Sequence, residues 1–136
     1  METKLLDTTF LIHHWAGRES VAEYLESQAE GTEYATTTIN LKEIAVGRKL
    51  TGEFDPVEIR AQFEWVRVVP ITVEIAWEVA EIESQLYRDE DVDQDRNESV
   101  AANAIIAGVA SELGATVVTE NVEDFERLGV DVEGYN

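Results

Sequence analysis

Two carboxylates stand among apolar residues, and both need a chemical reason. Asp7 directly follows the apolar residues of the segment KLL, and Glu43 shares one face of a predicted helix with Ile39, Val46 and Leu50. Burying a bare carboxylate is very costly, so such a group is neutralised, hydrogen-bonded or bound to a cation. Asp7 also suits the N-cap of a following helix, and that interpretation stays open beside cation binding.

Three further polar residues could add oxygen atoms to such a site. Asn103 lies in the first turns of a predicted helix, where polar side chains often satisfy backbone amides. Asn121 and Asp124 follow the apolar segment ATVV, where Asn is commonly a turn residue and Asp124 could equally be a surface acid beside a core Phe125. The face of the Asn103 helix that we expect to contact the core comprises Ala102, Ile106, Val109 and Leu113.

Short apolar segments alternate with amphipathic ones along the whole chain. The expected strands are 4–8, 33–38, 66–71, 115–119 and 130–135, the last at an edge; the expected helices are 10–17, 20–31, 38–52, 57–66, 72–88, 95–114 and 121–129. Asp95 and Glu98 resemble a capping box, and DEDVDQD before them reads as a charged loop. This alternation predicts an α/β fold with a central, mainly parallel sheet covered on both faces. Ligands in such folds bind beyond the carboxyl ends of the strands.

Composition limits the class of protein. With 136 residues we expect one domain, residues 1–136, and the absence of cysteine excludes disulfides and thiolate metal sites. No apolar segment is long enough to cross a membrane, which favours a soluble, cytoplasmic protein. The 29 acidic residues against 10 basic ones favour a halophilic protein, because molar salt screens self-repulsion; an ordinary acidic domain is the alternative. In such salt, the lack of a basic patch is weak evidence against nucleic acid as a partner.

Rival uses of strand-end acids fit less well. A phosphotransfer receiver domain needs a strand-end lysine, and the three lysines lie elsewhere in the predicted elements. A phosphatase with an Asp nucleophile would have a second acid where Thr9 stands, and DTTF lacks the glycines of a nucleotide-binding loop. His13 and His14 are adjacent, so they do not share a helix face; we expect them at the surface or an interface.

Taken together, the segments LLDTTFLI, TTTINLKEIAVG and NAIIAGVASELGATVVTENVEDF resemble the PIN-domain family, and within it the ribonuclease toxins of the VapC type. The resemblance covers nearly the whole chain. It implies a three-layer α/β/α sandwich and a nuclease that uses Mg²⁺ or Mn²⁺. It also implies an RNA substrate, an antitoxin partner and a homodimer.

The same resemblance assigns the site residue by residue. Asp7 and Glu43 match the first two acids of the family, and Thr9 matches the hydroxyl residue that often follows the first. Catalytic roles then fall to Asp7, Glu43, Asn103 and Asp124, and the metal ligands are these four with Asn121. Hard cations prefer such oxygen ligands, and the ion would prepare water for attack on a phosphodiester.

Asn103 departs from the family pattern, which has Asp at that position. An amide lacks the charge of a carboxylate, which at about 4 Å and an effective dielectric of 20 corresponds to about 4 kcal/mol before desolvation. The sequence therefore predicts weak metal binding. Three accounts stay open: a slower natural enzyme, an engineered inactivation, or a PIN fold retained only for protein binding. Trp15, Trp65 and Trp77 could serve interfaces, although we expect all three in the core.

Overall fold

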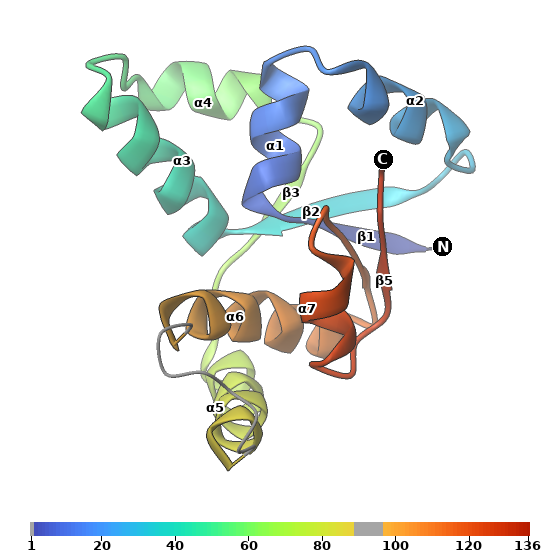
Figure 1. The fold of residues 1–136 in the computed structure, drawn as a ribbon. Coiled ribbons are helices and arrows are strands. Elements are labelled where there is room, and N and C mark those ends of the chain that lie inside the picture. The colour runs from blue at the N-terminus through green and yellow to red at the C-terminus, as the bar shows by residue number, and fades with distance from the viewer. Residues whose placement is uncertain (1, 89–96) are drawn as a thin grey trace.

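A five-stranded parallel sheet forms the centre of the computed structural model, which describes residues 2–88 and 97–136 (Figure 1). The strand order is β3-β2-β1-β4-β5, and every paired neighbour is parallel. The strands are β1 (Thr3–Leu6), β2 (Glu33–Thr37), β3 (Arg67–Val69), β4 (Thr116–Val118) and β5 (Val132–Glu133). All five expected strands are present, with β5 at an edge as predicted.

Helices cover both faces of this sheet, and neighbouring residues of one strand point into different cores. Leu6 packs with Phe10 on one face, whereas the adjacent Leu5 packs with Ile106 on the other. The first face is covered by α1 (Thr8–Trp15), α2 (Glu19–Ser27), α3 (Thr38–Leu50) and α4 (Pro56–Gln62). The second carries α5 (Val73–Arg88), α6 (Asn97–Leu113) and α7 (Val122–Glu126). This arrangement confirms the three-layer α/β/α sandwich.

The order of the strands reverses beside β1. The chain moves outward from β1 through β2 to β3 and then returns to β4 on the other side of β1. The carboxyl ends of β1 and β4 meet here, where the backbone N–H of Asp7 donates to the carbonyl of Val118 at 3.4 Å. A reversal of strand order is the usual ligand position in open α/β sheets.

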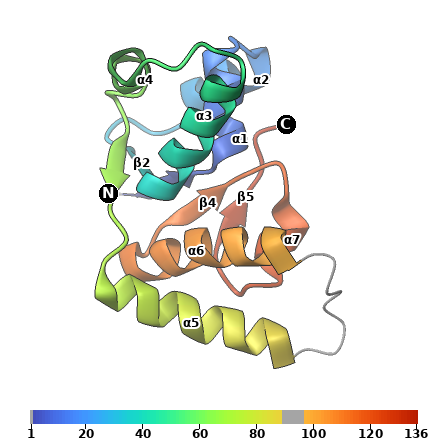
Figure 2. The same ribbon diagram turned by 90° about the vertical axis from the view of Figure 1, so that its left-hand side faces the viewer.

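Helix α6 is buried on two sides, because α5 packs along its outer surface (Figure 2). At Gly108 the helices approach so closely that an added Cβ would lie 2.4 Å from Cγ2 of Val79. Ala107 and Ala110, on the face of Asn103, are buried like Val109 on the opposite face. The expected core face of α6 is confirmed by Ile106 and Val109, and the opposite face is buried as well. The proposed loop and the Asp95 capping box lie outside the described residues.

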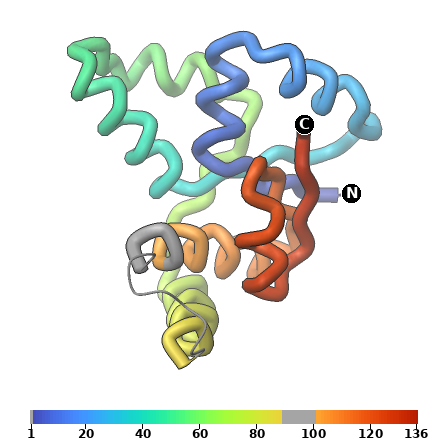
Figure 3. The backbone as a smooth tube through the Cα atoms, in the orientation of Figure 1, coloured from blue at the N-terminus to red at the C-terminus, as the bar shows by residue number. Residues whose placement is uncertain are grey.

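The chain ends lie on the same side of the molecule (Figure 3). Lys4 on β1 and Glu133 on β5 form an ion pair with 2.8 Å between Nζ and Oε1. Tyr24 on α2 also donates its hydroxyl to Glu133, at 2.5 Å. This cluster ties the first strand to the last.

Two sequence expectations about α4 and the tryptophans need correction. Helix α4 ends at Gln62, because the backbone leaves the helical region at Phe63, which packs into the core. Trp15 and Trp65 are half-buried against the core, but Trp77 on α5 is 70% exposed. Trp77 is exposed whereas Ile75 of the same helix is buried, so the apolar periodicity of α5 did not reveal which face is covered.

Candidate active site at the ends of β1 and β4

Asp7 is the N-cap of α1 and is buried, with 6% of its surface exposed. The backbone N–H of Phe10 donates to its Oδ1 at 2.9 Å, and the Thr119 hydroxyl donates to its Oδ2 at 2.6 Å. The capping interpretation is thus confirmed. Each carboxylate oxygen accepts about two hydrogen bonds, so both retain acceptor capacity for a ligand.

Glu43 accepts a hydrogen bond from Thr8, the residue that follows Asp7 in the chain. The hydroxyl of Thr8 donates to Oε2 of Glu43 at 3.0 Å and accepts from Nδ2 of Asn40 at 2.9 Å. Asn40 is fully buried and forms a capping box with Thr37, the N-cap of α3. The network begins at the end of β2 and fixes the direction of a carboxylate on α3.

The surroundings of Glu43 differ from the predicted apolar stripe. Glu43 is half-buried, but Val46 is 48% and Leu50 83% exposed. The buried residues of α3 are Asn40 and Ile44, because the helix packs against α1 along that side. Glu43 borders this buried face, and its hydrogen bond to Thr8 provides a partner that the helical pattern alone did not indicate.

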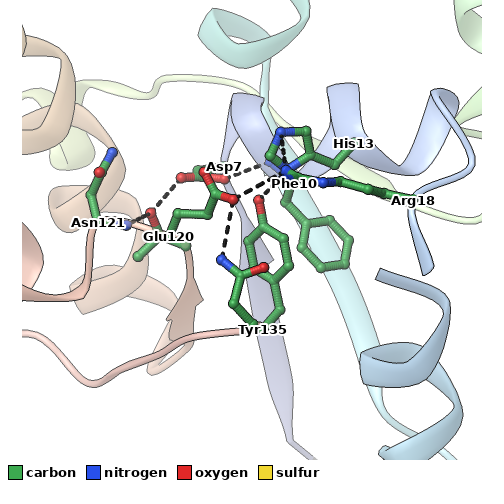
Figure 4. A network of polar contacts seen from close by, with 9 residues as sticks. Asp7, Phe10, His13, Arg18, Glu120, Asn121 and Tyr135 are labelled. Carbon is green, nitrogen blue, oxygen red and sulfur yellow. Dashed lines mark hydrogen bonds and ion pairs between the residues drawn. The ribbon is translucent and has the colours of Figure 1, made fainter. Parts of the chain in front are cut away.

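A second polar cluster lies next to Asp7 and includes the C-terminal residues (Figure 4). Glu120 pairs with Arg18, with 3.2 Å between Oε1 and Nη1, and lies 3.6 Å from Nδ1 of His13. The same His13 nitrogen is 2.7 Å from the hydroxyl of Tyr135, which is buried. His13 is therefore part of an internal network rather than a surface residue. His14 is half-buried against Trp65.

Burial raises the pKa of Asp7 above its ordinary value, and the negative charge of Glu120 adds to this effect. The hydrogen bonds from Thr119 and Phe10 and the nearby His13 act in the opposite direction but do not cancel it. The pKa of Tyr135 is raised as well, by burial and by the charges of Glu120 and Asp7. An additional cation beside Asp7 would favour its ionised form.

The other predicted site residues are held less firmly. Asn121 occupies the N-cap position of α7, yet its side chain makes no capping bond; its backbone N–H donates to the Thr119 hydroxyl at 3.0 Å. Asn103 is half-buried on α6, and Asp124 is exposed on α7, whereas Phe125 beside it is a core residue. Hydrogen bonds thus connect Asp7 with Thr119 and Asn121, and Glu43 with Thr8, while the side chains of Asn103 and Asp124 remain outside these networks in the described part of the chain.

Comparison with known families decides the class of the fold. The PIN domain family matches residues 4–131, which is nearly the whole chain. The chain belongs to the PIN domain family. No curated protein matches it significantly.

Solved structures share the fold of this PIN domain. It is similar to the structure of DNA-bound VapBC from Salmonella typhimurium, with a TM-score of 0.75, 24% identity and 100% of both chains covered. It is also similar to VapBC2 from Rickettsia felis bound to a promoter DNA fragment, with a TM-score of 0.76, 18% identity and coverage of 98% of this chain and 99% of the other. FitAcB from Neisseria gonorrhoeae gives a TM-score of 0.73 and 22% identity, with 97% of each chain covered. At such identities the likeness shows the fold.

The donors at the strand ends suit a hard cation in type. Asp7, Glu43 and the amide of Asn121 offer oxygen atoms, as Mg²⁺ and Mn²⁺ prefer. Within residues 2–88 and 97–136 no three or more Asp, Glu or His side chains are grouped so that they could hold a metal. A cation here would therefore depend on few carboxylates, with amide oxygens and water completing its coordination. The chemistry of Asp7 fits such an ion because its buried charge is met mainly by neutral donors.

Sequence reasoning missed three residues that organise the site. Thr8, rather than Thr9, binds Glu43, and Asn40 supports Thr8 from the first turn of α3. The spacing of Thr37 and Asn40 is that of a capping box, which could have indicated an ordered Asn. Glu120, between Thr119 and Asn121, could not be distinguished from the many other acids.

In the part of the chain that the structure describes, no helix is long and apolar enough to cross a membrane.

Proposed function

We propose that this PIN domain, residues 1–136, is a metal-dependent endoribonuclease of a toxin–antitoxin system. It hydrolyses RNA phosphodiester bonds, and Asn103 weakens its activity. The observation that supports this proposal most is the environment of Asp7. This buried carboxylate lies where the strand order reverses, accepts hydrogen bonds from two neutral donors, and has a raised pKa. Such a group is a candidate for function when it lies in a crevice.

In this proposal Mg²⁺ or Mn²⁺ is held by Asp7, Glu43, Asn103, Asn121 and Asp124. When bound, the ion would lower the pKa of water and stabilise charge on the phosphoryl oxygens. Thr119 and the backbone of Phe10 hold the Asp7 carboxylate, and Thr8 holds that of Glu43. Asn103 supplies an oxygen without a charge. The catalytic residues are Asp7, Glu43, Asn103 and Asp124.

The proposed partners are an RNA substrate, an antitoxin and a second copy of the chain, in the cytoplasm of a halophile. A further structure of this fold is named as a toxin–antitoxin complex from Klebsiella pneumoniae, with a TM-score of 0.68 and 23% identity, which supports an antitoxin for this chain. Exposed apolar side chains also favour protein contacts. They include Val46 and Leu50 on α3 and Val73, Trp77 and Tyr87 on α5.

A cleavage assay in concentrated KCl with Mg²⁺ or Mn²⁺ tests the proposal, using the natural chain and Asn103→Asp. The added carboxylate should increase the apparent metal affinity by roughly 10–100-fold. This factor corresponds to a fraction of the about 4 kcal/mol of charge interaction at about 4 Å. Ala22→Glu on α2 is the control, because it adds one negative charge at an exposed position on the opposite face of the sheet from α6. The control should leave metal dependence unchanged.

The second candidate is a PIN fold that binds a protein without catalysis. The amide at Asn103 and the lack of three grouped carboxylates or imidazoles among the described residues favour it. If neither the natural chain nor Asn103→Asp cuts RNA, the enzymatic proposal fails and the binding module is left. Cleavage by Asn103→Asp alone would identify the amide as the block.

A further inference from the structure

A cavity of about 750 Å³ opens on the far side of α3 from Glu43. It lies between α3, α4 and the edge strand β3, and Figure 1 and Figure 2 show α4 following α3 on the same face of the sheet. Leu41 lines this cavity, two residues before Glu43. Residues two apart on a helix point about 200° from each other, so α3 separates the cavity from the Thr8–Glu43 contact.

The cavity combines an apolar floor with a basic rim. Ile59, Phe63 and Val66 form buried walls, and the charged lining residues are Arg60, Arg67 and Glu64. Both arginines are exposed. The rim thus carries a net positive charge, in a chain whose formal net charge is −19.

Three other cations in the described residues are engaged, whereas Lys42, Arg88 and Arg127 form no ion pair there but do not line the cavity. Lys4 pairs with Glu133, and Arg18 pairs with Glu120. Arg48 lies over the ring of Trp15. In contrast, within residues 2–88 and 97–136 Arg60 and Arg67 form no ion pair within 4.0 Å. Arg60 and Arg67 line the same cavity and have no counterion within the described residues. They are therefore available to an anionic partner.

The cavity also reaches the end of the sheet where the strands have their carboxyl ends, and the candidate active site lies at the same end. Thr38, at the start of α3, and Pro70, just after β3, both line it, and both follow the carboxyl ends of parallel strands. Strand β3 lies two positions from β1, which corresponds to roughly 10 Å at the usual strand spacing. An extended chain crossing the first turn of α3 would therefore connect the cavity with Asp7.

We infer that this Arg60–Arg67 groove binds the phosphate backbone of the RNA strand next to the bond that is cut. Arginine forks match phosphate oxygens in geometry and charge, and phosphates recur along an extended strand. An acidic protein segment would offer carboxylates to the same rim, but the position on the carboxyl edge beside Asp7 favours the substrate. The inference rests on the proposed ribonuclease function and specifies where its substrate runs.

Fluorescence anisotropy with a single-stranded RNA oligonucleotide, in EDTA to prevent metal-dependent cleavage, measures binding by the full chain. Arg60→Gln/Arg67→Gln should weaken binding roughly tenfold at low KCl, and the slope of log affinity against log salt should fall by about 1.4, or about 0.7 per lost phosphate contact. The double Arg→Lys variant should retain most of the slope, because it keeps both charges. Glu64→Gln should tighten binding about twofold by removing the one negative charge of the rim.

Arg88→Gln is the matched control, because Arg88 is an exposed cation at the end of α5, outside the groove. In cleavage assays with Mn²⁺, the groove double variant should raise KM while kcat stays unchanged. Unaltered affinity, salt slope and KM in that variant would overturn the groove while leaving the ribonuclease proposal intact. Absence of both RNA binding and cleavage in the natural chain would overturn both. If the variant loses only a co-purifying protein, the groove holds a protein segment and the RNA inference is wrong.

Discussion

Strand β1 has a buried charge at each end, and the two charges are held in different ways. Lys4 is 4% exposed, and its ammonium group lies 2.8 Å from the carboxylate of Glu133. Asp7 is 6% exposed, and its hydrogen-bond donors are the neutral Phe10 amide and Thr119 hydroxyl. One buried charge has an internal counterion, and the other depends on neutral dipoles.

The pKa of each group is raised, but the consequence is opposite. For Lys4, burial lowers the pKa, but the hydrogen bonds and charges of Glu133 and Glu2 together raise it by more. The charged ammonium is therefore favoured. For Asp7, burial raises the pKa, so the charged carboxylate is disfavoured. The charge at the Lys4 end is met by an internal counterion, whereas a cation beside Asp7 would favour its charged form, as in a functional site.

The largest expected effect separates the two ends through Asp7→Asn. Asparagine is an equally good N-cap, so α1 keeps its first turn, while the negative charge is lost. RNA cleavage should fall at least roughly 100-fold, because the ion would lose a ligand charge. The free energy of unfolding at neutral pH, measured in urea, should be unchanged or higher, because a disfavoured buried charge is removed.

Asp131→Asn is the control for this variant, because the Asp131 side chain is exposed on the surface. It should cleave RNA at the natural rate. A clear loss of stability in Asp7→Asn would show that the Asp7 carboxylate is structural, and the contrast between the two ends of β1 would disappear.

At the Lys4 end of β1, we expect a substitution to change stability and not cleavage. Glu133→Gln removes the closer partner of Lys4, and because Glu2 remains at 3.3 Å the unfolding free energy should fall by about 1 kcal/mol, near the lower limit for an unpaired buried donor. Cleavage of RNA should stay unchanged. Glu26→Gln, an exposed substitution on α2, should have no effect on either quantity.

The pH dependence of this difference has a definite sign. Burial raises the pKa of Glu133, but hydrogen bonds from Lys4 and Tyr24 lower it further, and the net shift is downward. Its stabilising contribution is therefore present above the ordinary pKa of 4.5 and is lost as the pH falls through the lower value of the folded state. The unfolding free energies of the natural chain and of Glu133→Gln, measured in urea, should therefore converge in acid. A difference that persists there would mean that Glu133 acts through packing rather than charge.

The two ends also show how far the sequence predicts this molecule. The sheet and its helices were predictable because short apolar segments alternate with amphipathic ones, and Asp7 was recognised because it interrupts such a segment. The burial of the second face of α6 and the exposure of Trp77 were not, because each depends on which helix covers which surface. The partners of Lys4 and Glu43 come from distant segments, so no local pattern encodes them.

Substituting the Thr8 hydroxyl, which donates to Glu43, should slow cleavage less than the loss of the Asp7 charge. Thr8→Val preserves the shape of the side chain but removes both the donor to Glu43 and the acceptor for Asn40. We expect a loss of about 1 kcal/mol in unfolding free energy from the buried Asn40 amide, and roughly three- to tenfold slower cleavage as Glu43 becomes less well oriented. Thr8→Ser should restore both. Thr9→Val is the matched control, since family resemblance points to Thr9 whereas the structure places Thr8 on Glu43. If Thr9→Val slows cleavage and Thr8→Val does not, the carboxylate of Glu43 is oriented by something other than this hydrogen bond, and the Asp7 end of β1 is less preorganised than its contacts indicate.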